Sequence, residues 1–236
     1  MTTSCVALIP ARMESTRFPG KPLAPINGVP MVVRCAQNSL NAGLDTFICT
    51  DSQLICDAAN SYSIKSLLTP SFNTGTDRVN WAASRLNYSH VINLQGDEPL
   101  LSSTALSSFA EDTLRISNPD VILNGLSTLS PNYAFDPNNV KAILRNNSDI
   151  VYLSRKPVRN SSSSPIYIKQ LGLYGMKVET LNSFSQLPQS RLELVESVEM
   201  LRWLEAKNQL CGTVLDTPSI SVDTPEDLAD VEKAFD

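Results

Sequence analysis

The sequence predicts an α/β domain with a central, mostly parallel β-sheet. Of its 236 residues, 42% are hydrophobic, which is enough apolar material for one large core. In the first half, short apolar runs typical of strands alternate with segments typical of helices. Strands joined by helices pair in parallel through right-handed crossovers, so this order predicts a parallel sheet. No internal repeat divides the chain, and we predict a single domain over residues 1–236.

Capping and turn residues mark the elements of the first half. Pro30 is expected to open one helix, Ser52 to cap the next, and Ser102 or Ser103 to begin another. The expected strands are 5–9, 46–50, 64–68 and 90–94, and the expected helices are 31–40, 52–60, 76–86 and 102 or 103 to 116.

The second half is less regular and reads as a strand-rich insertion followed by helices. The expected strands are 121–128, 140–144, 151–153 and 166–176, with the serine-rich run 160–164 as a solvated loop. A helix over 192–207 is predicted from an apolar stripe at helical spacing, formed by Leu194, Val198, Leu201 and Leu204. Thr224 is expected to cap a last helix that begins at Pro225.

Charge and cysteine content exclude several classes of protein. The net charge is −5, from 19 basic and 24 acidic residues without a basic run, so nucleic acid is not an expected partner. No apolar stretch approaches about 18 residues, and the N-terminus lacks a basic region, so we expect neither a membrane span nor a signal peptide. Five cysteines without a CxxC pair favour free thiols in the cytoplasm over zinc or disulfides. His90 is expected to be packed or hydrogen-bonded near a strand start, without a catalytic role.

A basic loop directly after the first strand is the most informative segment. Within it, Arg12, Arg17 and Lys21 supply three cations, and Ser15 and Thr16 supply two hydroxyls. The loop lies at the carboxyl edge of the sheet, where open α/β folds bind ligands, and it can wrap a triphosphate. It matches neither the Walker A nor the GxGxxG pattern. The alternative is an ordinary basic surface loop, which is less favoured in an acidic chain.

The fourth strand ends in a second candidate site, Gln95-Gly96-Asp97. Asp97 is expected at the same sheet edge as the basic loop, where a carboxylate beside a triphosphate requires a cation such as Mg²⁺ between them. Gly96 permits close approach, and Gln95 can bond a sugar hydroxyl. The alternative interpretation of Asp97 is turn formation alone.

Three further groups have weaker functional signals. Thr74 or Thr76 is expected to cap a helix whose N-terminus could face an anion or a base. Asp223 precedes the last helix, a position that favours a carboxylate in any case. Along the helix predicted over 192–207, an acidic line is expected to be a solvated face, although Glu199 could accept bonds from a polyhydroxy substrate. That line consists of Glu193, Glu196 and Glu199, followed by Arg202.

From residue 6 to residue 231, the order of motifs resembles that of CMP-Kdo synthetases, the cytidylyltransferases that activate 3-deoxy-manno-octulosonate (Kdo). The motifs are the basic loop, Gln-Gly-Asp-Glu-Pro at 95–99, Tyr-Leu-Ser-Arg at 152–155, Leu-Gly-Leu-Tyr-Gly at 171–175 and Val-Asp-Thr-Pro-Glu-Asp at 222–227. The resemblance implies a Rossmann-like nucleotide-diphospho-sugar transferase fold, dependence on Mg²⁺ and a homodimer. It also implies that residues 1–118 mainly bind CTP and that residues 119–236 mainly bind the sugar acid and form the dimer.

The resemblance also implies roles for individual residues. The triphosphate contacts would be Arg12, Ser15, Arg17 and Lys21, and Thr74 and Gly75 would lie near the cytosine and ribose. Asp97 and Asp223 would hold the metal. The sugar acid would be held by Gln95, Tyr174 and Glu199.

Two positions depart from the family pattern. Gln170 stands where the family usually has His, and Met200 stands where it usually has Gln. Both positions belong to the sugar pocket by resemblance, so we expect poor use of unmodified Kdo and a preference for a modified acid with a more apolar substituent.

The reaction implied is Mg²⁺-dependent transfer of CMP from CTP to the anomeric hydroxyl of Kdo or a related 3-deoxy-2-ulosonic acid, with release of pyrophosphate. Lys21, Asp97, Asp223 and Arg12 would be its catalytic residues. The product would serve lipopolysaccharide, capsule or another glycan. Two alternatives are a glycosyltransferase of similar fold, which would need Asp-x-Asp at the strand end, and a non-catalytic nucleotide- or sugar-binding relative.

Overall fold

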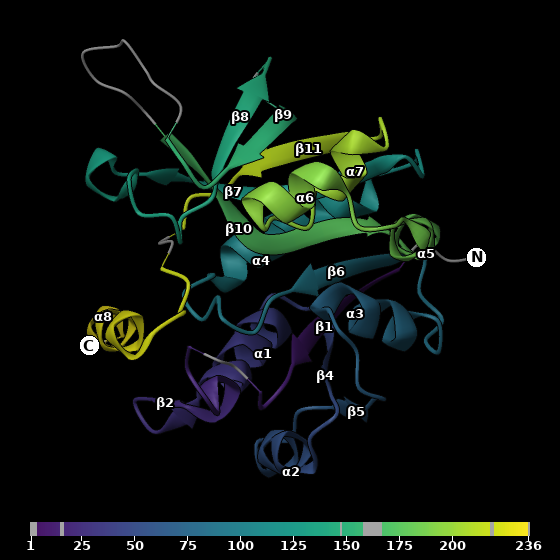
Figure 1. Ribbon diagram of the computed structural model, residues 1–236. Coiled ribbons are helices and arrows are strands. Elements are labelled where there is room, and N and C mark those ends of the chain that lie inside the picture. Colours follow the sequence, from purple (N-terminus) through teal and green to yellow (C-terminus); the bar gives the residue numbers. More distant parts are fainter. Residues whose placement is uncertain (1–3, 15–16, 147, 158–166, 218–219, 236) are drawn as a thin grey trace.

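A computed structural model describes residues 4–14, 17–146, 148–157, 167–217 and 220–235 of the chain. Within these residues, one nine-stranded sheet runs through both halves of the chain, in the order β5-β4-β1-β6-β10-β7-β11-β9-β8 (Figure 1). Its strands are β1 (Cys5–Ala11), β4 (Asp45–Thr50), β5 (Ser66–Leu68), β6 (His90–Leu94), β7 (Val121–Leu129), β8 (Lys141–Arg145), β9 (Asp149–Ser154), β10 (Tyr167–Lys177) and β11 (Gln209–Val214). A small separate hairpin pairs β2 (Pro25–Ile26) with β3 (Val29–Pro30).

The direction of the strands follows the connections between them. In the first half, β5, β4, β1 and β6 are parallel, as expected for strands joined through helices. In the second half, β10 runs antiparallel to both β6 and β7, and β9 runs antiparallel to β8 and β11. The other seven strands share one direction, so the prediction of an α/β fold with a mostly parallel sheet and a strand-rich second half is confirmed.

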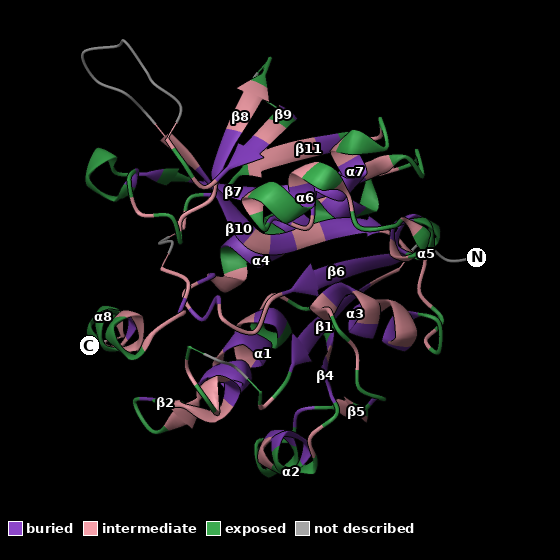
Figure 2. Cartoon of the chain, in the orientation of Figure 1, coloured by how far each residue is buried: buried purple, intermediate pink, exposed green. Residues whose placement is uncertain are grey.

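Helices cover both faces of the sheet. They are α1 (Met31–Asn41), α2 (Gln53–Ser61), α3 (Gly75–Ala83), α4 (Ser103–Leu114), α5 (Val178–Gln186), α6 (Arg191–Glu196), α7 (Leu201–Glu205) and α8 (Pro225–Ala234), with short 3₁₀ turns at Lys21–Leu23 and Pro131–Tyr133. In β1, Ala7 and Ile9 join the core formed with α1, α2 and α4, whereas Val6 and Leu8 join the core formed with α3, α5 and α7. This alternation is the two-residue period of a strand that is buried on both faces, and Figure 2 shows β1 and β6 buried almost throughout.

Most expected elements of the first half are present, with their ends shifted by a few residues. Ser102 and Thr224 accept the capping hydrogen bonds of α4 and α8, and His90 is bonded at the start of β6 to Ser89 and to the carbonyl of Ile116. The five cysteines are free thiols, as expected. No helix in the described part of the chain has the length and apolar character needed to cross a membrane.

The single helix predicted over 192–207 is wrong, because two short helices occupy this segment. Ser197 adopts a left-handed conformation, with φ of 53°, and ends α6. The apolar stripe is also interrupted, since Leu194 is 62% exposed whereas Val198 and Leu201 are buried. Helix α5 and strand β11 were not expected from the sequence pattern. The serine-rich run 160–164 lies outside the described residues.

Candidate functional site

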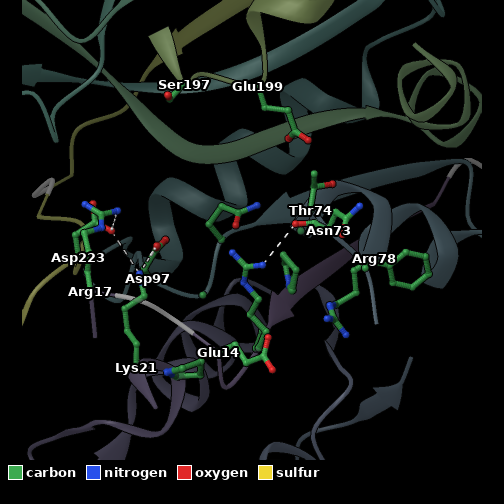
Figure 3. A pocket seen from close by; sticks show the side chains of 18 of the residues that line it. Glu14, Arg17, Lys21, Asn73, Thr74, Arg78, Asp97, Ser197, Glu199 and Asp223 are labelled. Carbon is green, nitrogen blue, oxygen red and sulfur yellow. Dashed lines mark hydrogen bonds and ion pairs between the residues drawn. The ribbon is translucent and has the colours of Figure 1, made fainter. Parts of the chain in front are cut away.

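A cavity of about 1190 Å³ opens at the carboxyl ends of β1 and β6. Its walls come from six segments: the basic loop after β1, the turn before α3, the turn after β6, the end of β9, the α6–α7 connection and the residues before α8. Figure 3 shows Arg17, Lys21, Asp97 and Asp223 together on one side, and Asn73, Thr74 and Arg78 on the other. The topology therefore brings the predicted basic loop and both predicted aspartates to one place.

Lys21 joins the two aspartates. Its Nζ lies 2.8 Å from Asp97 Oδ2 and 3.6 Å from Asp223 Oδ1, and it also donates to the carbonyl of Val222 at 2.8 Å. Gly20, with φ of 73°, makes the left-handed turn that begins the 3₁₀ segment of Lys21. Burial lowers the pKa of the Lys21 ammonium, but the two carboxylates together raise it by more. The net pKa of Lys21 therefore lies above its usual value.

The other two cations of the basic loop lie nearer to solvent. Arg17 Nη2 is 3.0 Å from Asp223 Oδ1, and Arg17 Nη1 donates to the side chain of Asn138 at 3.2 Å. Arg12 donates to the carbonyl of Asn73 at 3.5 Å, across the cavity from the aspartates. Ser15 lies outside the described residues. The described cations of the loop thus face the cavity from more than one side, as a polyanion site requires.

The turn before α3 packs tightly against β1. Of the two candidate caps, Thr74 is the one used, since its side chain accepts from the backbone of Asp77. A Cβ at Gly75 would lie 3.2 Å from Pro10 Cγ, so this position has little room for a side chain. Thr76 instead donates to Glu199 Oε2 at 2.5 Å and so ties α3 to the α6–α7 connection.

The acidic line on α6 and α7 is not the solvated face expected from the sequence. Glu193 and Arg202 are only 6% and 7% exposed and form a two-pronged ion pair, with N–O distances of 2.6 and 2.8 Å. Glu199 lines the cavity, and its buried Oε1 has no hydrogen-bond partner among the described residues. Burial raises the pKa of the Glu199 carboxyl, although the bond from Thr76 lowers it in part. This Oε1 is shielded from solvent and lies 3.9 Å from Arg202 Nη2, so it has an ion-pair partner but no hydrogen bond among the described residues.

The residues that the resemblance assigns to the sugar acid lie in two different environments. Gln95 and Glu199 line the cavity, and the Gln95 amide donates to Asn93 Oδ1 at 2.9 Å. Gln170, Tyr174 and Met200 are not among the lining residues. Gln170 is 8% exposed and donates to Asn124 Oδ1, Met200 is 1% exposed within the core, and Tyr174 packs against that same core.

The family model described as cytidylyltransferase matches residues 6–210. The chain belongs to this cytidylyltransferase family. The 3-deoxy-manno-octulosonate cytidylyltransferase of Chloroherpeton thalassium is 35% identical, over 96% of each chain. The 8-amino-3,8-dideoxy-manno-octulosonate cytidylyltransferase of Shewanella frigidimarina is 37% identical, over 95% of this chain and 96% of its own.

Solved structures place the cytidylyltransferase fold in a wider group. A CMP:2-keto-3-deoxy-manno-octonic acid synthetase complexed with CTP matches with a TM-score of 0.89 at 30% identity, covering 99% of this chain and 98% of that one. A UDP-glucose pyrophosphorylase complexed with UDP-glucose matches with a TM-score of 0.70 at 13% identity, covering 99% and 98%, and shows the fold alone. The resemblance to CMP-Kdo synthetases and the Rossmann-like nucleotidyltransferase fold are therefore confirmed.

The donor set of this cytidylyltransferase fits a divalent cation held by oxygen ligands. The described residues contain no cluster of three or more His, Cys, Asp or Glu side chains suited to a metal. Asp97 and Asp223 nevertheless approach a single cation, the ammonium of Lys21. Mg²⁺ is bound in this way in many phosphate-transfer sites, by one or two carboxylates together with substrate phosphates.

Several cavity residues were not assigned a role from the sequence. Arg155 follows β9, and its guanidinium donates to the carbonyls of Pro137, Glu196 and Ser197. Its place after a strand in the Tyr-Leu-Ser-Arg motif is a signal that could have identified it. Arg78 is 2% exposed and pairs with Asp51 at 2.8 Å. Because Arg78 and Asp51 lie far apart in the sequence, no local pattern could have indicated this ion pair.

Proposed function

We propose that this cytidylyltransferase transfers CMP from CTP to the anomeric hydroxyl of Kdo, or of a closely related 3-deoxy-2-ulosonic acid, and releases pyrophosphate. The observation that supports this most directly is the match to the CTP-bound CMP:2-keto-3-deoxy-manno-octonic acid synthetase, with a TM-score of 0.89 over 99% of this chain. The cavity, with its cations and its two aspartates at the sheet edge, is of the kind that this reaction needs.

In the proposed reaction, the sugar hydroxyl attacks the α-phosphorus of CTP and pyrophosphate leaves. Arg12, Arg17 and Lys21 would bind the triphosphate and offset the charge that develops on the leaving pyrophosphate. Asp97 and Asp223 would hold Mg²⁺, which when bound polarises phosphate oxygens and lowers the pKa of a nearby hydroxyl.

The nucleoside and the sugar would lie against adjoining parts of the cavity wall. The segment at Thr74 and Gly75 would lie near the cytosine and ribose, where α3 begins and its backbone N–H groups can face the ligand. Next to this segment, the side chains of Glu199 and Gln95 line the cavity and would bind hydroxyls of the sugar. No covalent intermediate with the protein is required.

The test is release of pyrophosphate from CTP with Kdo and, in parallel, with 8-amino-3,8-dideoxy-manno-octulosonate. We expect release with at least one of these acids, dependence on Mg²⁺ and little release when UTP replaces CTP. A glycosyltransferase would instead consume a sugar nucleotide. If a curated relative is active under the same conditions but the folded protein releases no pyrophosphate with either acid, the proposed function is wrong and a non-catalytic binding role is favoured.

We also propose that the enzyme is a homodimer formed through its second half and acts in the cytoplasm. Exposed apolar side chains in that half, including Tyr133, Phe135 and Val151, would be covered by such an interface. The free thiols suit a reducing compartment. Light scattering of the purified protein measures the oligomeric state directly, and a monomer at micromolar concentration would contradict the dimer.

A further inference from the structure

Glu98 follows Asp97 in the turn after β6, but it is buried in the protein. It is 4% exposed, and its Oε1 accepts two hydrogen bonds, each of 2.8 Å. One comes from the backbone N–H of Gly172 in β10, and the other comes from the hydroxyl of Ser221. This one carboxylate oxygen therefore joins the turn after β6 to β10 and to the segment before α8.

Lys169 extends this contact. The Lys169 side chain is 3% exposed, and its Nζ donates to Ser221 Oγ at 3.2 Å. The Ser221 hydroxyl thus accepts from a buried ammonium while it donates to a buried carboxylate. A buried network with charges of both signs and a hydroxyl between them holds its members in one arrangement, because each charge is stabilised by the other and by the hydroxyl.

The network lies directly beside the two proposed metal ligands. Glu98 is adjacent to Asp97, and Ser221 is two residues from Asp223. The backbone N–H of Val222 also donates to the carbonyl of Asp97 at 2.9 Å, so the two segments run side by side. Gly172 completes the contact, because a Cβ there would lie 2.8 Å from Gln95 Cβ and would push the turn away from β10.

We infer that Glu98, acting through Ser221, is a positioning residue that fixes the spacing between the carboxylates of Asp97 and Asp223. Neither Glu98 nor Ser221 lines the cavity, so both act through the aspartates rather than on substrate. Groups that orient the ligands of a metal typically change metal affinity by about 10–100-fold when they are removed. The inference rests on the proposed function, since it assigns the two aspartates to a divalent cation.

The test is binding of Mn²⁺ alone, measured from the electron paramagnetic resonance signal of the free ion. Ser221→Ala removes the bridging hydroxyl, Glu98→Gln removes the charge but keeps the shape, and Ser221→Thr keeps a hydroxyl. Thr180→Val is the matched control. Thr180 lies in α5, which contributes no residue to the cavity. The substitution deletes its buried hydrogen bond of 2.7 Å to the carbonyl of Pro119.

We expect Ser221→Ala and Glu98→Gln to weaken Mn²⁺ binding by roughly tenfold. Ser221→Thr should retain most of the parental Mn²⁺ affinity. Thr180→Val should leave this affinity unchanged, even when its melting temperature falls as far as that of Ser221→Ala. Parental affinity in Ser221→Ala and Glu98→Gln, or an equal loss in Thr180→Val, would show that the network only stabilises the fold. A parent that releases pyrophosphate from CTP but binds no Mn²⁺ would overturn this inference and leave the proposed function standing.

Discussion

In the proposed site, Lys21 occupies the position that a divalent cation would take between Asp97 and Asp223. Its ammonium lies 2.8 Å and 3.6 Å from their nearest oxygens, whereas Mg²⁺ sits about 2.0–2.1 Å from carboxylate oxygens. The two cations cannot share this position. Under the proposed function, Lys21 would therefore leave the aspartates when Mg²⁺ binds and would contact the phosphates of CTP instead.

This geometry predicts opposite effects of Lys21→Met on two ligands. Affinity for Mn²⁺ without nucleotide should rise, because a competing cation is lost. The KM for CTP should rise and kcat should fall, because a positive charge near the triphosphate is lost, while the KM for the sugar should move much less. Mn²⁺ titration and steady-state kinetics measure these quantities. A larger change in the sugar KM than in the CTP KM would place Lys21 in the acceptor site instead.

Asp97→Asn should nearly abolish turnover and leave the fold intact. The substitution removes one carboxylate charge at the metal position, and we expect a loss in rate of at least about 10²-fold, on the scale of lost transition-state charge stabilisation. Circular dichroism checks the fold, and pyrophosphate release measures the rate. Near-normal Mg²⁺-dependent activity in the folded variant would remove Asp97 from the metal site.

The structure places Met200 in the core, although the sequence assigned it to the sugar pocket. Its departure from the family pattern led to the hypothesis of an altered sugar pocket, but its side chain is 1% exposed and packs in the core beneath α3, α5 and α7. Met200→Gln would place an amide there without a partner, at a cost of about 1–3 kcal/mol. We therefore expect chemical denaturation to show a loss of stability, and kinetics to show little change in selectivity between Kdo and modified acids. A gain in kcat/KM for Kdo without a loss of stability would restore the altered-pocket hypothesis.

At the scale of elements, the break between α6 and α7 shapes the upper wall of the cavity. A capping box of Ser190 and Glu193 begins α6, and the left-handed Ser197 ends it after six residues. The buried pair of Glu193 and Arg202 then fastens α7 against α6. This arrangement places Glu199, in the connection between them, beside Thr76 of α3.

Loss of the partner in this pair should be costly and dependent on pH. Arg202→Met leaves the Glu193 carboxylate buried and unpaired, which costs about 3–5 kcal/mol at neutral pH. Burial raises the pKa of Glu193, but the hydrogen bonds from Arg202, Ser190 and Gln189, together with the charge of Arg202, lower it more, and the net pKa lies below its usual value. The stabilisation is therefore complete above the unfolded pKa of about 4.5 and is lost as pH falls through the folded pKa.

Urea unfolding at several pH values tests this prediction. The difference in unfolding free energy between parent and Arg202→Met should be large at pH 7 and should shrink below about pH 4.5. Arg115→Met is the matched control, because Arg115 also lies 2.7 Å from a carboxylate but is 71% exposed. Its loss should cost less than about 1 kcal/mol. A pH-independent difference for Arg202→Met would show that packing, rather than the ion pair, accounts for the loss.

At the scale of the whole molecule, sequence patterns predicted the features that depend on neighbouring residues and on the order of the elements. The parallel first half, the caps Thr74, Ser102 and Thr224, and the meeting of the basic loop with Asp97 all follow from strand order and capping residues. The antiparallel insertion of β10 between β6 and β7 could not be predicted in this way, because it joins segments far apart in the chain. The burial of Glu193 and the bond of Glu199 to Thr76 depend on the same long-range packing.

The position of the cavity between the two halves gives a prediction for the whole chain. Residues 12–97 supply the basic loop, the turn before α3 and Asp97, while residues 155–223 supply Arg155, Glu199 and Asp223. A bound nucleotide with Mg²⁺ would contact both halves at once and would favour the folded state of the entire domain. At a concentration 100 times its Kd, such a ligand stabilises the folded state by about 2.7 kcal/mol.

For a chain of this length, each kcal/mol shifts the melting temperature by about 2–4 °C, so CTP with Mg²⁺ should raise it by roughly 5–11 °C. EDTA should remove most of this shift, because the triphosphate would then lie beside the two carboxylates without a divalent cation between them. In Asp97→Asn the shift caused by CTP should depend much less on Mg²⁺, since one of those carboxylates is gone. Differential scanning fluorimetry measures all three cases. An equal shift with and without EDTA in the parent would show that CTP binds away from Asp97 and Asp223, and the assignment of this cavity to the nucleotide would then be wrong.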